Sequence, residues 1–212
     1  MRRLLLTETI GTFFLVFACT GAVIVDAQTH ALGSTGTAAV AGLAVIALIY
    51  SFSHISGAHF NPAVTVSFWL LGMLRGPLAV LYILAQLLGA LAASSMLLLL
   101  FGNTAALGAT LPQASWHQAF CFEFLLTFWL VFVILGSSVH GKAIRSFAGV
   151  SVGAAVALAS LIGGPVSGAS MNPARSLAPA LLSGSLHDLW IYLTATLLGA
   201  VCAALLYRRL YT

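Results

Sequence analysis

Long apolar stretches separated by short polar segments dominate this sequence. Six of the stretches approach the length of about 20 residues that an α-helix needs to cross a bilayer. These six are residues 4–25, 37–52, 77–101, 119–139, 147–163 and 189–207. Two shorter apolar segments, 61–72 and 172–182, remain. As helices rising 1.5 Å per residue they would cover about 16 Å, roughly half of a 30 Å hydrocarbon core. The pattern predicts an all-α membrane protein with six transmembrane helices and two re-entrant half-helices.

Each short segment begins with nearly the same polar sequence. SGAHFNPAVT occupies residues 56–65, and SGASMNPARS occupies residues 167–176. Asparagine suits a helix cap and proline suits the first turn, where its missing N–H leaves no hydrogen bond unmade. A single Asn-Pro pair is typical of a simple turn. Two copies in matched positions, each before a half-length apolar segment, favour the start of a half-helix instead.

The repetition extends beyond this motif. ETIGTFFLVF at 8–17 matches EFLLTFWLVF at 123–132, and LLGA occurs at both 87–90 and 197–200. We therefore divide one transmembrane channel domain, 1–212, into half-repeats 1–101 and 117–212, joined by a loop at 102–116. Three spans per half is an odd number, so the halves enter the membrane from opposite sides. Such an inverted 3+3 repeat is typical of transport proteins whose site lies at the repeat interface.

The inversion places the two half-helices N-terminus to N-terminus near the membrane midplane. Irregular backbone at that depth is tolerated only where it is buried in protein or lines a wet cavity. Each N-terminus carries a partial positive charge. Two of them directed at one place would repel cations and interrupt a proton-conducting chain of water.

The composition supports a membrane location. Hydrophobic residues make up 61% of the chain and charged residues 6%, whereas a soluble domain carries about 25% charged residues. Most of the surface should therefore face lipid. The net charge of +4 does not indicate nucleic-acid binding, because the basic residues are few and scattered.

The positions of the charges predict the orientation. With the N-terminus in the cytoplasm, all basic residues of the loops and termini fall on that side, as the positive-inside rule requires. These residues are Arg2, Arg3, Arg75, Lys142, Arg145, Arg208 and Arg209. The opposite loops contain Asp26 and Asp188. We expect a multi-pass protein of the cell (inner) membrane, with both termini cytoplasmic.

The chain resembles the aquaporin (major intrinsic protein) family over its whole length. The resemblance rests on two Asn-Pro-Ala (NPA) motifs and the arginine after the second: Asn61-Pro62-Ala63, Asn172-Pro173-Ala174 and Arg175. It implies a pore in each subunit of a homotetramer. It also implies that Asn61 and Asn172 donate hydrogen bonds to the solute, and that Arg175 lines a narrow selectivity filter.

In the family the filter combines this arginine with three positions counted from the NPA asparagines. Here those positions are Ala41, Ser160 and Ala169. Water-selective members carry an aromatic residue and a histidine there, and glycerol facilitators carry two aromatics. Three small residues imply a wider opening and resemble the nodulin-26-like branch and the bacterial metalloid facilitators, which pass arsenous, boric or silicic acid. A water-selective aquaporin and a glycerol or urea facilitator remain alternatives.

Two glutamates, Glu8 and Glu123, lie inside predicted spans at matching places in the repeat. An intramembrane carboxylate is a candidate for a proton relay. It can also accept hydrogen bonds from backbone N–H groups of a re-entrant loop, which otherwise lack partners. The matched placement beside matched loops favours structural support of the loops. An ion-coupled carrier, which would need acidic residues on the substrate path, is therefore less favoured than a passive channel.

No residue set is typical of an enzyme, and we expect neither catalysis nor a cofactor. His54 and His59 lie five residues apart without a third ligand nearby, so a hydrogen-bonded histidine is favoured over a metal site. Cys19, Cys121 and Cys202 all lie within apolar runs. Their spacing indicates no disulfide framework, and we expect thiols that face lipid or the core.

Overall fold

The computed structural model describes residues 1–211 and confirms the all-α membrane architecture. Within these residues six helices are long and apolar enough to cross a membrane, and two half-length helices follow the NPA asparagines. The helices are α1 (Arg2–Thr29), α2 (Gly33–Ser56), α3 (Pro62–Leu70), α4 (Gly76–Phe101), α5 (Trp116–Ile134), α6 (Ala148–Ser167), α7 (Pro173–Ser183) and α8 (Leu189–Tyr211). α3 and α7 are the predicted half-helices.

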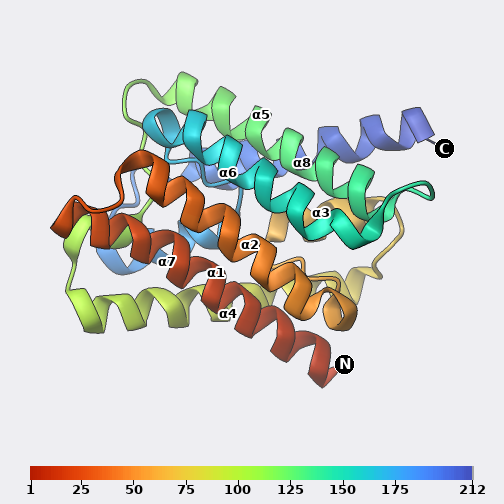
Figure 1. Ribbon diagram of the computed structural model, residues 1–212, viewed down its shortest axis with the longest axis horizontal. Coiled ribbons are helices and arrows are strands. Elements are labelled where there is room, and N and C mark those ends of the chain that lie inside the picture. Colours follow the sequence, from red (N-terminus) through yellow and green to blue (C-terminus); the bar gives the residue numbers. More distant parts are fainter. Residues whose placement is uncertain (212) are drawn as a thin grey trace.

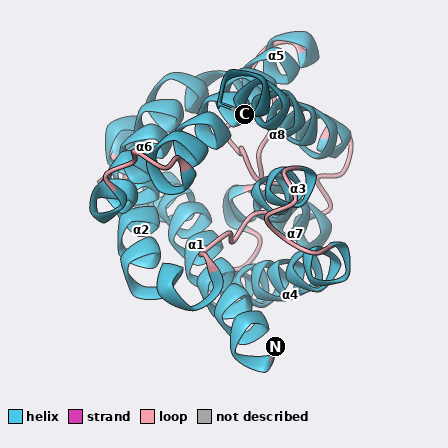
Figure 2. Ribbon diagram, turned by 90° about the vertical axis from the view of Figure 1, so that its right-hand side faces the viewer, coloured by secondary structure: helices cyan, strands magenta, loops and turns pink. Residues whose placement is uncertain are grey.

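The four helices of the first half correspond one to one with those of the second. α1 packs against α4 as α5 packs against α8, and α2 packs against α6 across the two halves (Figure 1). Each half-helix lies against a long helix of the opposite half, α3 against α8 and α7 against α4. Viewed along the helices, the loops that precede α3 and α7 pass inside the ring of long helices (Figure 2).

Glycines allow the closest helix contacts, and they too follow the repeat. A Cβ atom on Gly89 of α4 would overlap the carbonyl oxygen of Thr9 on α1. At the equivalent contact, a Cβ on Gly199 of α8 would overlap the carbonyl oxygen of Phe124 on α5. Small residues at such positions are typical of helix pairs that pack within a membrane, where backbones must approach closely.

The basic segments gather at one end of the molecule. Both termini lie at the right-hand end in Figure 1, as do the loop between α3 and α4 and the loop between α5 and α6. Arg75 lies directly before α4, and Lys142 lies in the loop before α6. This arrangement agrees with a common membrane side for these charges.

The segment that joins the halves folds back onto the second half. Gln113 N donates to the carbonyl oxygen of Val166 (3.0 Å), and the hydroxyl groups of Thr110 and Ser176 are hydrogen-bonded (2.7 Å). α5 begins at Trp116, the last residue of the predicted loop 102–116. At its other end α5 continues into a π-helical turn, Leu135–Val139, so that the span is Trp116–Val139.

Candidate functional site: a cavity between the two halves

The loops that lead into α3 and α7 share one unusual conformation. Three residues of each loop have positive φ angles: Gly57 (88°), Ala58 (54°) and Phe60 (48°) in the first, and Gly168 (84°), Ala169 (46°) and Met171 (53°) in the second. Residues other than glycine rarely adopt this region. Such backbone persists only where its surroundings hold it, and in both loops a buried glutamate does so.

Glu8 holds the first loop. Its Oε1 atom accepts hydrogen bonds from Ser56 Oγ (2.6 Å) and from His59 N (3.1 Å). Its Oε2 atom accepts from Phe60 N (2.8 Å) and from Gln86 Nε2 (2.8 Å). The carboxylate is fully buried. Without it, two backbone N–H groups of the loop would have no partner in this part of the membrane.

Glu123 holds the second loop in the same way. Oε1 accepts from Ser167 Oγ (2.7 Å) and Ser170 N (2.8 Å), and Oε2 accepts from Met171 N (2.8 Å). The equivalent of Gln86 in this half is Thr196, whose hydroxyl donates to a backbone carbonyl of its own helix instead. Glu123 therefore has three donors where Glu8 has four. Neither glutamate lines the cavity described below.

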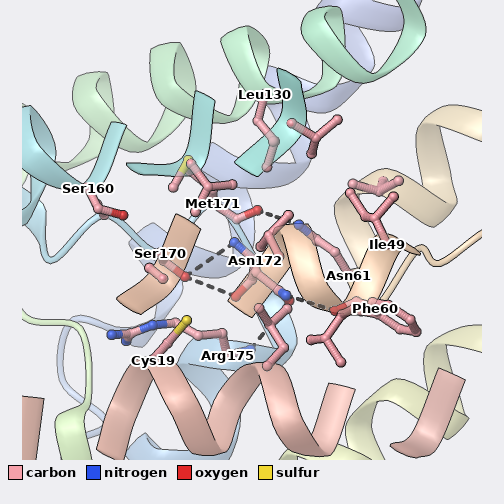
Figure 3. Close-up of a pocket in the computed structure, with 18 of the residues that line it drawn as sticks. Cys19, Ile49, Phe60, Asn61, Leu130, Ser160, Ser170, Met171, Asn172 and Arg175 are labelled. Atoms are coloured by element: carbon pink, nitrogen blue, oxygen red, sulfur yellow. Dashed lines mark hydrogen bonds between the residues drawn. The ribbon is translucent and has the colours of Figure 1, made fainter. Parts of the chain in front are cut away.

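The two NPA asparagines connect the halves. Asn61 Oδ1 accepts from Ala63 N (2.9 Å), and Asn61 Nδ2 donates to the carbonyl oxygen of Met171 (2.7 Å). Asn172 likewise caps α7 and donates from Nδ2 to the carbonyl oxygen of Phe60 (2.9 Å) (Figure 3). An amide nitrogen carries two hydrogens. Each asparagine therefore has one further N–H that makes no hydrogen bond within the described residues.

A cavity of about 1040 Å³ lies between the halves. It is lined by all four residues predicted to form the selectivity filter and by both NPA asparagines: Ala41, Ser160, Ala169, Arg175, Asn61 and Asn172. Much of the remaining wall is aliphatic, with Val45, Leu48, Ile49, Leu130 and Val156 among its residues. In Figure 3, Ser160 and Arg175 lie toward one end of the view, Ile49 and Asn61 toward the other, and Asn172 between them.

Arg175 supplies hydrogen-bond donors to this cavity. It lies in the first turn of α7 and is 7% exposed. Within residues 1–211 its guanidinium donates no hydrogen bond, and Nη1 is completely buried without a partner. A buried guanidinium normally finds acceptors, so this one has hydrogen-bonding capacity that the described part of the protein leaves unused.

The loops supply the matching acceptors. Residues 57–60 and 168–171 line the cavity. In the described part of the chain, the carbonyl oxygens of residues 57–59 and 168–170 accept no hydrogen bond. The residues that line the cavity therefore include side-chain N–H groups of Asn61 and Asn172 and backbone carbonyl groups of both loops whose hydrogen-bonding capacity is not used within the described residues.

The two histidines differ in their surroundings. His59 is buried, and its ring Nδ1 is hydrogen-bonded to the Thr65 hydroxyl (3.2 Å). His54 is exposed, and both histidines line the cavity. Among residues 1–211, no three histidine, cysteine, aspartate or glutamate side chains are close enough to hold a metal ion.

Cys19 is one of the cavity residues that the sequence did not predict. Cys121 and Cys202 are exposed on the outer surface of the helices, where we expect lipid. Cys19, in contrast, lines the cavity. Cys19 packs against the buried cluster that includes Ala41 and Val152, as a core thiol does, and it also lines the cavity, which the sequence did not predict. A spacing signal exists, because Leu15, Cys19, Val23 and Asp26 fall on one helical face and all line the cavity.

The structure combines an inverted repeat of apolar helices with a cavity between the two halves, into which the loops of two asparagine-capped half-helices lead. These features together define a class of protein, the membrane channels for small solutes. Comparison with known proteins agrees. Residues 1–207 match the sequence profile of the major intrinsic protein family. Nodulin-26 of Glycine max is 45% identical over 208 residues, which cover 96% of this chain and 76% of that protein. Aquaporin NIP1-2 of Oryza sativa subsp. japonica is 46% identical over 215 residues, covering 98% and 71%.

Solved structures show the same relationship. The X-ray structure of the aquaglyceroporin from Plasmodium falciparum aligns with a TM-score of 0.84 at 28% identity and covers 97% of this chain and 95% of that one. The chain belongs to the major intrinsic protein family. It is a passive membrane channel for water and small solutes, not an enzyme.

Proposed function

We propose that this channel passes water and small uncharged polar solutes, including metalloid hydroxides such as arsenous, boric or silicic acid, and excludes ions and protons. The observation that carries the proposal is the set of side chains around Arg175. Ala41, Ser160 and Ala169 line the same cavity as the arginine, and none is aromatic. Small side chains at these positions leave room for a solute wider than water.

The hydrogen-bonding groups of the cavity fit a polyhydroxy solute. Such a molecule loses water on entry, and each unreplaced hydrogen bond is unfavourable. The spare N–H groups of Asn61, Asn172 and Arg175 face its oxygens, and the loop carbonyls accept from its hydroxyl hydrogens. The aliphatic wall offers no strong partner, so the solute is not held tightly.

Exclusion of cations follows from charge. Arg175 is cationic, and the N-termini of α3 and α7 each carry about half a positive charge. Two unit charges about 4 Å apart repel or attract each other by roughly 4 kcal/mol at an effective dielectric of 20. A wide filter excludes few ions by size alone. The positive charge of Arg175 and the N-termini of α3 and α7 must therefore provide most of the free-energy barrier to cations.

Passive transport is favoured over ion coupling. A coupled carrier needs acidic groups on the solute path. Glu8 and Glu123 are instead fully buried and accept seven hydrogen bonds in all, six of them from the two loops and the helix ends that lead into them. A second candidate is a water or glycerol channel. The names of Aquaporin NIP1-2 and of the aquaglyceroporin relative support it.

We further propose a homotetramer in the cell (inner) membrane with cytoplasmic termini. The long helices carry many exposed large apolar residues, among them Leu43, Leu88, Leu99 and Trp129, which suit contact with lipid or with other subunits. The basic segments share the end at which both termini lie (Figure 1), which is typical of the cytoplasmic side. Cross-linking in membranes tests the tetramer, and accessibility of tags at the termini tests the orientation.

The test of the solute class is an uptake panel in proteoliposomes without an ion gradient. Water, glycerol, urea, boric acid and arsenous acid are compared for the wild type and for the double variant Ala41→Phe/Ser160→His. We expect the wild type to pass all of them and the variant to pass mainly water. A wild type that passes water alone would refute the wide filter, and uptake only with an ion gradient would refute the passive channel.

A further inference from the structure

A row of three hydroxyl groups lies behind the second loop. Ser170 belongs to the loop itself, Ser176 to the first turn of α7, and Thr110 to the segment that joins the halves. All three residues are buried, and neither Thr110 nor Ser176 lines the cavity. Ser170 and Ser176 are the sequence neighbours of two residues of the predicted filter, Ala169 and Arg175. The row therefore connects the chain directly beside both filter residues that lie here.

The hydrogen bonds of this row have one direction. A hydroxyl group has a single hydrogen to donate, and Ser170 Oγ donates its own to the carbonyl oxygen of Asn172 (2.9 Å) (Figure 3). In the bond between Ser170 Oγ and Ser176 Oγ (2.5 Å), Ser176 must then be the donor. Thr110 must in turn donate to Ser176 Oγ (2.7 Å). The row thus begins at Thr110 and ends at the asparagine that caps α7.

The first half contains an equivalent row with a different third member. His59 and Thr65 occupy the positions of Ser170 and Ser176 in the repeat, and His59 Nδ1 is hydrogen-bonded to the Thr65 hydroxyl (3.2 Å). Gln86 of α4 completes this row, because its Nε2 atom donates to Thr65 Oγ1 (2.9 Å). In the first half the third member therefore comes from a transmembrane helix of the same half.

In the second half the connecting segment replaces that helix. The equivalent of Gln86 on α8 is Thr196, whose hydroxyl donates to a backbone carbonyl of its own helix. Thr110 takes its place as the donor to the row. The segment around Thr110 is itself fixed, since Gln113 N donates to the carbonyl oxygen of Val166 (3.0 Å).

We propose that Thr110 is a positioning residue of the selectivity filter, which holds the two serines in place and through them fixes the spacing between Ala169 and Arg175. The proposal rests on the proposed function, in which these two residues line the filter. The carbonyl groups of residues 168–170, which accept no hydrogen bond within the described residues, are fixed by the same contacts. Binding groups act together only when they are held at defined positions.

The consequence depends on the solute. A molecule with several hydroxyl groups must replace several hydrogen bonds to water at once, so it needs several partners at fixed distances. Water needs fewer. Loss of the Thr110 hydroxyl should therefore reduce the passage of polyhydroxy solutes more than the passage of water.

Two substitutions separate the hydroxyl group from the rest of the side chain. Thr110→Val keeps the shape and removes the donor to Ser176. Thr110→Ser keeps the donor and removes the methyl group, which lies so close to Gly168 that a Cβ atom there would come within 3.1 Å of it. Thr104→Val is the matched control, because Thr104 lies in the same segment and its hydroxyl donates to the carbonyl oxygen of Phe101 (2.8 Å), away from the second loop.

The first measurement is the ratio of glycerol permeability to water permeability, obtained with the full chain in proteoliposomes by stopped-flow light scattering. We expect Thr110→Val to lower this ratio several-fold, and Thr110→Ser and Thr104→Val to keep the wild-type ratio. An unchanged ratio in Thr110→Val would overturn the role in selectivity. A ratio lowered equally in Thr110→Val and Thr110→Ser would overturn the role of the hydroxyl group.

Hydrogen–deuterium exchange of the detergent-solubilised protein, read by mass spectrometry, separates this proposal from the proposed function because it does not depend on transport. In Thr110→Val we expect the amides of residues 168–176 to exchange several-fold faster, while those of residues 57–65 in the first loop keep the wild-type rate. Thr110→Ser should restore slow exchange. Unchanged exchange at 168–176, or equal acceleration in both loops, would overturn the row of hydroxyl groups. A wild type that passes water alone would refute the proposed function, and the exchange rates would still decide whether Thr110 holds the second loop.

Discussion

Glu123 provides the sharpest test of what holds the second loop in the membrane. Replacing Glu123 by alanine removes the acceptor of Ser170 N and Met171 N. The Ser167 hydroxyl also loses this bond but keeps the carbonyl oxygen of Gly163 (3.3 Å). The change therefore leaves two buried backbone donors without a partner, in a loop whose backbone is already strained.

The magnitude follows from these contacts. A buried donor left unsatisfied is unfavourable by about 1–3 kcal/mol, so Glu123→Ala should lower the free energy of unfolding by about 2–6 kcal/mol. Glu123→Gln keeps one oxygen for Ser170 N but presents an amide nitrogen to Met171 N. Because one backbone donor is left without an acceptor, we expect an intermediate decrease in the free energy of unfolding, about 1–3 kcal/mol.

The free energy of unfolding is measured in mixed detergent micelles by titration with sodium dodecyl sulfate, followed by circular dichroism. Asp26→Ala is the matched control. Asp26 Oδ1 also accepts from two backbone N–H groups, of Leu32 (3.0 Å) and Gly33 (2.7 Å), but Gly33 is exposed. Water replaces that acceptor, and the loss should stay below about 1 kcal/mol.

The reasoning fails if Glu123→Ala and Asp26→Ala destabilise the protein equally. It also fails if Glu123→Gln keeps full stability and changes the pH dependence of solute flux. That second result would favour the proton relay over the loop acceptor.

Three other predictions concern the filter, the charge barrier and the helix packing. Ala169→Phe should suppress uptake of urea and larger solutes while sparing water in a stopped-flow swelling assay, and equal loss of both fluxes would contradict a filter role. Arg175→Val should keep neutral-solute flux with at most a small proton leak, measured with a pH-sensitive dye in vesicles. Adding Asn172→Ala, which removes the cap of α7, should raise the leak much further, and an equally leaky single variant would exclude a dipole contribution. Gly42→Leu should lower the free energy of unfolding by about 1–3 kcal/mol through overpacking, because a Cβ atom at this position would meet Ala157 and the Gly153 carbonyl on α6. Gly136→Ala is the control, and it should change this free energy little because the space around Gly136 is open.

The course of the chain through the membrane was readable from the sequence. Apolar length gives the number of spans, because a helix must bury its backbone hydrogen bonds over about 30 Å of hydrocarbon. Asn-Pro starts a helix by local chemistry that needs no tertiary partner, and the structure indeed begins α3 at Pro62 and α7 at Pro173. Two copies of this motif, each in a half with three spans, indicated the inverted repeat.

Which side of each helix faces the pore could not be read in this way. In a soluble protein polarity marks the outward face, but here lipid and protein interior are both apolar, so hydrophobicity does not distinguish them. The position of Cys19 beside the cavity could not be predicted for that reason. Its place on the cavity wall depends on how α1 is rotated when it packs against α2 and α4.

The bonds between the halves were equally out of reach of the sequence. Asn61 donates to Met171 and Asn172 to Phe60, pairs that lie 110 and 112 residues apart along the chain. They exist only once the two loops meet inside the ring of helices. Within the first half, the hydrogen bond from Gln86 to Glu8 likewise exists only once α4 packs against α1. Local chemistry determined where the chain enters the membrane and turns, and only packing of the two halves decided which atoms face the solute.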